Sequence, residues 1–64
     1  MEQLIAEIEM AIPTGWQWLV CKKKVGYFAN IYKEGDVKSI NQAVGMDYTA
    51  ALNAAFHLYL DRYV

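Results

Sequence analysis

The chain has 64 residues, a formal net charge of −1 and a single cysteine, Cys21. One cysteine excludes an internal disulfide, and with one histidine, His57, the ligands are too few for a structural zinc site. A nearly neutral chain also lacks the global field that attracts nucleic acid or an anionic membrane. So short a chain buries only about 60 % of the surface that its unfolded form exposes. We therefore expect one domain, residues 1–64, that relies on good packing or on self-association.

The sequence predicts a soluble protein of the cytoplasm. Its first residues lack the positive region of a secretory signal peptide and carry Glu2, Glu7 and Glu9 instead. No apolar run approaches the roughly 20 residues that a membrane-spanning helix needs. We expect no membrane attachment, and we expect Cys21 to be reduced.

The first predicted element is an amphipathic helix over about residues 2–11. Its apolar residues follow the three- and four-residue spacing of one helix face. They are Met1, Leu4, Ile5, Ile8 and Ile12. Glu2 lies where negative charge stabilises a helix N-terminus. Pro13 ends the helix because the residue before a proline avoids the α conformation, and Thr14-Gly15 continue as a turn.

Two strands joined by a tight turn follow the first helix. Residues 16–22 and 27–33 are rich in aromatic and β-branched side chains, and the turn between them ends at Gly26, which suits a positive φ. A second turn is predicted over residues 34–36. Residues 37–44 are ambiguous, and we favour a short third strand over 37–40 that runs into a turn at Gly45.

The last predicted element is an alanine-rich helix over about residues 48–62. Asp47 is its predicted N-cap, because the carboxylate can accept the free backbone N–H groups of the first turn. The main apolar stripe consists of Leu52, Ala55, Phe56, Tyr59 and Tyr63. The small residues around this stripe either allow close approach of another backbone or reflect the high helix propensity of alanine. The fold class is therefore α+β: a helix, a β-hairpin with a short third strand, and a second helix, with the helices covering a small antiparallel sheet.

Both faces of the predicted hairpin are apolar, whereas a sheet with one solvated face alternates apolar and polar residues. One face of the first strand carries Trp16, Trp18 and Val20, while the other carries Leu19 and Cys21. The second strand divides into Phe28, Asn30 and Tyr32 on one face and Tyr27, Ala29 and Ile31 on the other. The two helices, one on each side, could cover both faces; alternatively a partner molecule covers one of them. A homodimer or larger assembly is therefore expected.

Three segments also suggest a family. They are Trp16-Gln-Trp18, Tyr27-Phe-Ala-Asn-Ile31 and Asp47-Tyr-Thr-Ala-Ala-Leu52 followed by Ala54-Ala55. In this order they resemble the small phage proteins of the phage αβα-sandwich domain type, over roughly residues 16–60. The resemblance implies phage or prophage origin, action in the host cytoplasm, a layered α/β/α fold and no assigned reaction. Small phage proteins of this kind include inhibitors of bacterial defence, among them anti-CRISPR proteins.

No residue set predicts catalysis. His57 and Asp61 lie four residues apart and can meet on one helix face, but an ordinary surface pair explains them better than an oriented general base does. Cys21 would act as a nucleophile only in contact with His57 and a third, orienting group. Its alternation with Leu19 favours a small buried core residue. We expect a protein that is not an enzyme, with no catalytic residue, metal site or cofactor.

Aromatic side chains are the strongest candidates for contact with a partner, because Trp and Tyr are enriched at interface hot spots. The candidate partner-binding residues are Trp16, Trp18, Tyr27, Phe28 and Tyr32. The alternative is that all are core residues whose polar tips reach water. The expected function is that of a non-enzymatic, phage-type accessory protein that binds another protein of unknown identity. Inhibition of a host or defence complex is the specific hypothesis.

Lys22, Lys23 and Lys24 form the one run of charge, at the predicted hairpin tip. The alternative function is a small nucleic-acid-binding protein in which these lysines hold phosphates while neighbouring aromatic rings stack on bases. The simpler interpretation is a solvated turn whose lysines prevent the strands from pairing with other chains.

Overall fold

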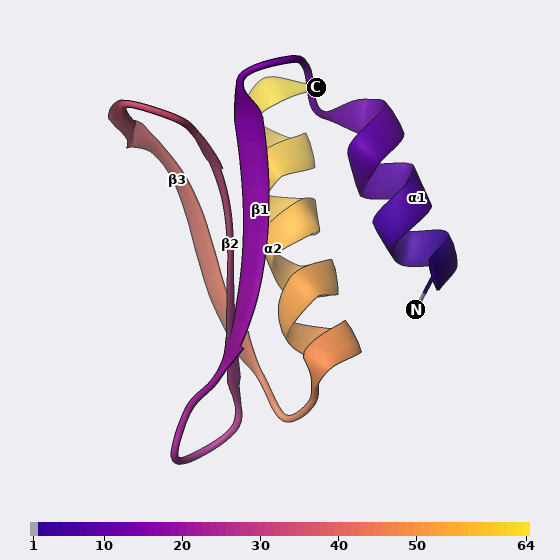
Figure 1. The fold of residues 1–64 in the computed structure, drawn as a ribbon, viewed down its shortest axis with the longest axis vertical. Helices are drawn as coiled ribbons and strands as arrows, with labels where there is room; N and C mark the ends of the chain where they lie inside the picture. Colours follow the sequence, from indigo (N-terminus) through magenta and orange to yellow (C-terminus); the bar gives the residue numbers. More distant parts are fainter. Residues whose placement is uncertain (1) are drawn as a thin grey trace.

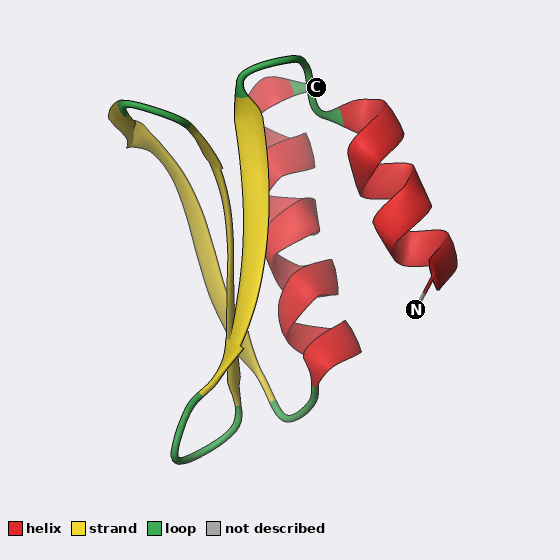
Figure 2. Ribbon diagram, in the orientation of Figure 1, coloured by secondary structure: helices red, strands yellow, loops and turns green. Residues whose placement is uncertain are grey.

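The computed structural model describes residues 2–64, so Met1 of the predicted apolar stripe lies outside the described residues. The elements are α1 (Glu2–Ala11), β1 (Trp16–Lys22), β2 (Tyr27–Lys33), β3 (Asp36–Gly45) and α2 (Tyr48–Tyr63) (Figure 2). The strands form one antiparallel sheet in the order β1-β2-β3. The α+β fold class is confirmed, as are the first helix and the hairpin.

Both helices lie on the same side of the sheet (Figure 1). Helix α2 packs directly on the strands, and α1 packs beside α2. The molecule therefore has two layers, and the arrangement with one helix on each side, which the resemblance also implied, is not the one found. Within residues 2–64, no helix covers the other face of the sheet, here called the outer face.

The core lies between α2 and the middle of the sheet. Ala29 and Ile31 of β2 are fully buried, as is Ile8 of α1. The residues of α2 that face them are Ala51, Leu52, Ala55, Phe56 and Tyr59, all buried. Since two of these are alanines with no exposed surface, the small side chains do bring the helix close to the sheet. Tyr63, predicted on the same stripe, is 44 % exposed at the end of α2.

Strand β3 is longer than predicted: it extends through residues 41–45 instead of ending near residue 40. The cause lies in two buried polar residues on its inner face. Asn41 donates from Nδ2 to the carbonyls of Ile31 (3.0 Å) and Ser39 (2.8 Å). The Ser39 hydroxyl in turn accepts from the backbone N–H of Lys33 and donates to the carbonyl of Asp36. These bonds satisfy polar groups that would otherwise oppose burial.

The start of α2 matches the prediction. Asp47 has extended backbone angles (φ −140°, ψ 175°), and its Oδ1 accepts from the N–H of Ala50 at 2.8 Å. Asp47 is therefore the N-cap of α2. None of the helices within residues 2–64 is long and apolar enough to cross a membrane.

Candidate binding surfaces

The structure assembles no catalytic centre from the residues considered above. Cys21 is exposed at the outer face, so the prediction that it is a buried core residue is wrong. It lies near the end of β1, where no helix covers the outer face. His57 and Asp61 are both exposed on α2, which packs against the opposite face of the sheet. Within residues 2–64 no three metal-ligating side chains cluster together.

The five candidate aromatic residues lie on two different faces of the sheet. Trp16, Trp18 and Tyr27 share the helix side with buried Ala29 and Ile31, because alternate residues along a strand and directly paired residues share a face. Phe28 and Tyr32 point to the outer face. The candidates therefore do not form one surface.

Trp16 and Tyr27 are held by other aromatic rings. The indole of Trp16 makes edge contacts with Tyr59 and Tyr63, with ring centroids 5.0 and 4.9 Å apart. Tyr27 packs edge-on against Tyr48, with centroids 6.4 Å apart. Such pairs add to the stability gained by burial alone. These two rings are thus structural parts of the helix–sheet interface as well as candidates for binding.

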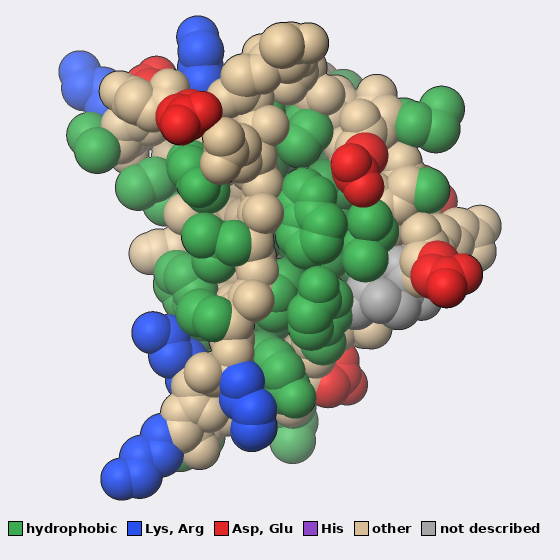
Figure 3. Space-filling model, viewed as in Figure 1, with side chains coloured by type: hydrophobic (Ala, Val, Ile, Leu, Met, Phe, Trp, Pro, Cys, Tyr) green, Lys and Arg blue, Asp and Glu red, His purple; other side chains and the backbone are tan. Residues whose placement is uncertain are grey.

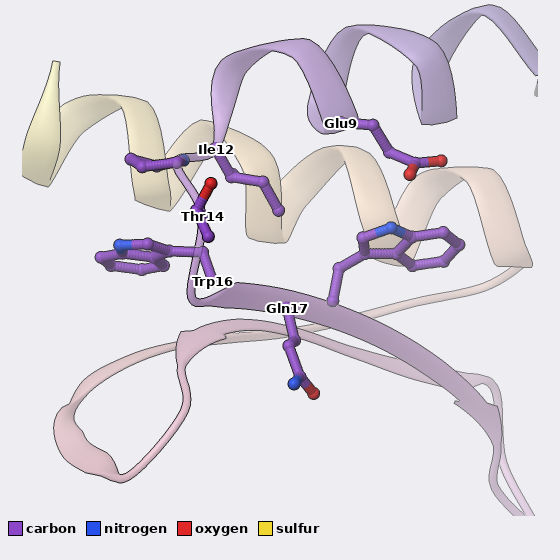
Figure 4. A pocket seen from close by; sticks show the side chains of 7 residues that line it. Glu9, Ile12, Thr14, Trp16 and Gln17 are labelled. Atoms are coloured by element: carbon purple, nitrogen blue, oxygen red, sulfur yellow. The ribbon is translucent and has the colours of Figure 1, made fainter.

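A cleft of about 470 Å³ lies between the end of α1 and the start of β1. Figure 4 shows Trp16 and Ile12 on one side of the strand, Glu9 one turn earlier on α1, and Gln17 on the opposite side of β1. Trp18 also lines the cleft. Within residues 2–64 no hydrogen bond or ion pair engages the Glu9 carboxylate. Indole faces beside a free carboxylate suit a cationic group.

The outer face of the sheet carries a set of apolar side chains from all three strands. Its members are Leu19, Phe28, Tyr32, Ile40 and Val44, of which Ile40 is 38 % and Val44 is 74 % exposed. A groove of about 370 Å³ runs along it between Leu19, Tyr32, Val37 and Ile40. Asn30 also lines the groove, and its Oδ1 is buried without a hydrogen-bond partner in the described residues.

A chain of hydrogen-bonded polar side chains lies at one end of the outer face. The Tyr32 hydroxyl donates to Oε1 of Gln17 (3.1 Å), and Nε2 of Gln17 donates to a carboxylate oxygen of Glu34 (2.8 Å). This chain of bonds holds the Tyr32 ring across the strands. Tyr32 is thus an apolar ring with a fixed polar tip, as in many interface residues.

The lysine run lies at the β1–β2 hairpin tip, the loop at the bottom of Figure 1. Two of the ammonium groups lie over aromatic rings of their own hairpin: Lys22 Nζ is 5.1 Å from the centroid of Tyr27, and Lys23 Nζ is 5.3 Å from that of Phe28. The tip also exposes Val25. The positive charge is therefore divided between the two faces of the sheet.

The two edges of the sheet differ in their protection. Arg62 of α2 covers part of the β3 edge, donating to the carbonyls of Ile40 and Lys38. At β1, every second residue directs its backbone N–H and carbonyl toward β2, and the residues between direct theirs away from it. The hydrogen bond from Lys23 N–H to the Gly26 carbonyl (3.0 Å) shows that Trp18 and Val20 belong to the second group. Within residues 2–64 no other backbone group binds them.

Sequence reasoning missed the cleft position of Glu9, the contacts of Arg62 and the β3 side chains of the outer face. The alternation of Ile40 and Val44 was hidden because β3 was predicted to be short. The contact of Arg62 with β3 joins residues more than 20 positions apart, and no local pattern reports such a contact. Comparison with protein-family models, curated proteins and solved structures finds no match to this chain.

Proposed function

We propose that this chain is a non-enzymatic binding protein that contacts another protein through the outer face of its sheet. One observation carries the proposal: apolar side chains from three strands share a face that no described helix covers. Contiguous apolar surface of this kind marks interaction sites on small proteins. Two aromatic rings on its central strand, Phe28 toward one end and Tyr32 toward the other, are residue types that anchor interfaces.

The class of partner follows from the chemistry of this face. The middle of the outer face carries apolar and amide side chains, among them Gln42 and Asn30. Its charged side chains lie at the two ends, with the lysines at the hairpin tip and Lys33, Glu34 and Asp36 at the opposite end. Such a surface suits a protein partner with an apolar centre and a polar rim. A phage-encoded inhibitor of a host or defence complex is the specific form of this proposal, and it is supported by the family resemblance alone.

A photo-activated cross-linking residue at Gln42 tests this proposal. Gln42 is exposed and lies opposite Asn30 on the outer face, while Asn53 is exposed on α2 and serves as the matched control. In host cells, the probe at position 42 should label one discrete protein that the probe at position 53 does not. The purified partner should then bind the wild type and lose affinity with Ile40→Glu. Equal labelling from both positions would contradict the proposal.

Nucleic-acid binding is the second candidate function. The observation that favours it is the position of two lysines over partly buried hairpin aromatics, Lys22 at Tyr27 and Lys23 at Phe28. A cation beside a ring that can stack on a base is the arrangement used by proteins that bind single strands. Three lysines on a chain with a net charge of −1 supply few phosphate contacts, so this candidate ranks below protein binding.

A further inference from the structure

The exposed edge of β1 is the least protected part of the sheet. Edge strands are normally blunted by charge, proline, a bulge or a covering element. Residues 16–21 contain no charged side chain and no proline. β1 pairs with β2 in continuous register along its whole length, and the register shift in this sheet lies between β2 and β3. Residues 16–21 therefore lack a charge, a proline and a bulge, and the charge of β1 is confined to Lys22 at its end.

Both sides of the β1 edge are apolar. Figure 3 shows the strand backbone as a tan stripe with green hydrophobic side chains on either side of it. By the strand register, Trp18 and Val20 lie on the helix side of β1 and Leu19 on the outer side; all three are partly exposed. A strand added here would gain backbone hydrogen bonds and apolar contacts on both faces.

We propose that the β1 strands of two copies of this chain pair antiparallel about a two-fold axis, which joins two three-stranded sheets into one of six strands. The inference goes beyond the proposed function and does not depend on it, because pairing at β1 engages Leu19 but leaves the outer-face side chains of β2 and β3 free. In a two-fold interface the same patch serves both copies. The register that overlaps all of β1 places Leu19 opposite Leu19 of the second copy.

This register is consistent with the hydrogen-bonding alternation of β1. It pairs Trp18 with Val20 of the second copy, and these are the residues whose N–H and carbonyl groups point away from β2. The N–H of Trp16 already donates to the carbonyl of Pro13 at 3.1 Å, which marks one end of the free edge. The open edge is thus self-complementary.

Charge complementarity supports a second copy as the occupant. The same register places Lys22 of the second copy opposite Trp16, on the face where the α1–β1 cleft opens. That cleft holds indole faces and the unengaged Glu9 carboxylate, which together suit an ammonium group. Lys22 is the one charged residue of β1. Its ammonium group lies over the Tyr27 ring of its own chain and would turn toward the cleft of the second copy on pairing.

Introducing a charge at Leu19 tests the two-fold register. Leu19→Lys and Leu19→Glu each place like charges directly opposite one another in the dimer, while in the monomer the side chain is partly exposed. By sedimentation equilibrium, the wild type should dimerise at micromolar concentration and each variant should dimerise about tenfold more weakly or worse. An equal mixture of the two variants should regain the dimer. A monomeric wild type at hundreds of micromolar, or a mixture that stays monomeric, would overturn the inference.

Proline substitutions separate edge pairing from stacking of the outer faces. Val20→Pro removes an N–H that points away from β2, and Gln42→Pro makes the same change at the β3 edge, whose outward groups alternate in the same way. If circular dichroism shows both variants folded, only Val20→Pro should lose the dimer. Loss of the dimer with Gln42→Pro alone would assign the contact to β3.

The cleft is tested by matched charge reversals on α1. Glu9→Lys should weaken dimerisation, whereas Glu7→Lys, an exposed residue that does not line the cleft, should leave it unchanged. Adding Lys22→Glu to Glu9→Lys should restore affinity, because the pair is re-formed with reversed charge. Equal effects of Glu9→Lys and Glu7→Lys would show that the cleft does not receive Lys22, and would overturn this part of the inference.

Discussion

The guanidinium of Arg62 lies against the edge of β3 and donates from Nη1 to the carbonyl oxygen of Ile40 at 2.8 Å. The same nitrogen donates to Oδ1 of buried Asn41 at 3.0 Å, and Nη2 donates to the carbonyl of Lys38 at 3.0 Å. A planar group with several donors in fixed geometry is suited to this task. One side chain at the end of α2 thus joins the helix to β3, satisfies a buried amide and occupies part of a sheet edge.

Arg62→Ala should destabilise the fold markedly. It removes three hydrogen bonds from a charged donor and leaves the Oδ1 of Asn41 unsatisfied, which together should cost about 1–3 kcal/mol of the free energy of unfolding. Urea denaturation followed by circular dichroism measures the loss. Arg62→Lys should recover only part of it, because an ammonium group cannot bind three acceptors in this arrangement. The control is Asp61→Ala at the adjacent exposed position, which should unfold like the wild type; an equal loss there would contradict this role of Arg62.

Local signals were sufficient to predict most element boundaries. Pro13 ends the first helix, Gly26 has φ of +79° in the hairpin turn, and Asp47 caps α2. Each of these residues determines the conformation of the chain within a few positions of itself, so the element boundary can be predicted from the local sequence alone. The boundaries of α1, β1 and β2 agree with the prediction for this reason.

The full length of β3 could not be predicted in the same way. Its inner face carries Ser39, Asn41 and Ala43 in place of large apolar residues, so the usual alternation is absent. Burial of the two polar side chains depends on bonds to the backbone and to Arg62. These partners come from other parts of the chain and are known only once the fold is known.

The distribution of the candidate site residues was also beyond local reasoning. Because both faces of the hairpin are apolar, the pattern did not show which face the helices would cover. The choice depends on packing between distant elements, such as the contact of Trp16 with Tyr59 and Tyr63. It leaves Phe28 and Tyr32 on the uncovered side and exposes Cys21.

Asp47→Ala should remove about 0.5–2 kcal/mol from the free energy of unfolding, because the N–H of Ala50 loses its acceptor. For a domain of this size the melting temperature should fall by roughly 4–8 °C per kcal/mol. Thermal melts of Asp47→Asn and Asp47→Ser should show a smaller fall, since either side chain still accepts the bond. If the alanine and asparagine variants melt together at the wild-type temperature, the cap contributes nothing.

Binding to nucleic acid should be weak and sensitive to salt. If the lysine tip binds phosphates, the affinity for mixed-sequence DNA or RNA should fall as salt rises, because counterions are released on binding. Fluorescence anisotropy should show no appreciable binding at physiological salt. At low salt, any binding should disappear when Lys22, Lys23 and Lys24 are replaced by Glu. Submicromolar affinity at physiological salt would place nucleic-acid binding ahead of protein binding.

Gly45→Ala should be among the most destabilising single changes in the chain. A Cβ at Gly45 would lie 2.5 Å from the backbone nitrogen of Ala51 and 2.9 Å from its Cα. These are backbone atoms of the first turn of α2, so the end of β3 and the helix would have to separate. Forced overpacking of this kind typically costs about 1–3 kcal/mol, measured as a lower urea midpoint.

Gly35 provides the comparison, because its constraint has a different physical origin. It has φ of +82° with open space around it. Gly35→Ala should therefore lower the stability through backbone strain alone, without any steric clash. Asparagine tolerates this conformation better than alanine does, so Gly35→Asn should be more stable than Gly35→Ala. Gly45→Asn should bring no such recovery over Gly45→Ala, because any side chain meets the same backbone atoms. Wild-type stability of Gly45→Ala would show that β3 and the start of α2 are not in such close contact.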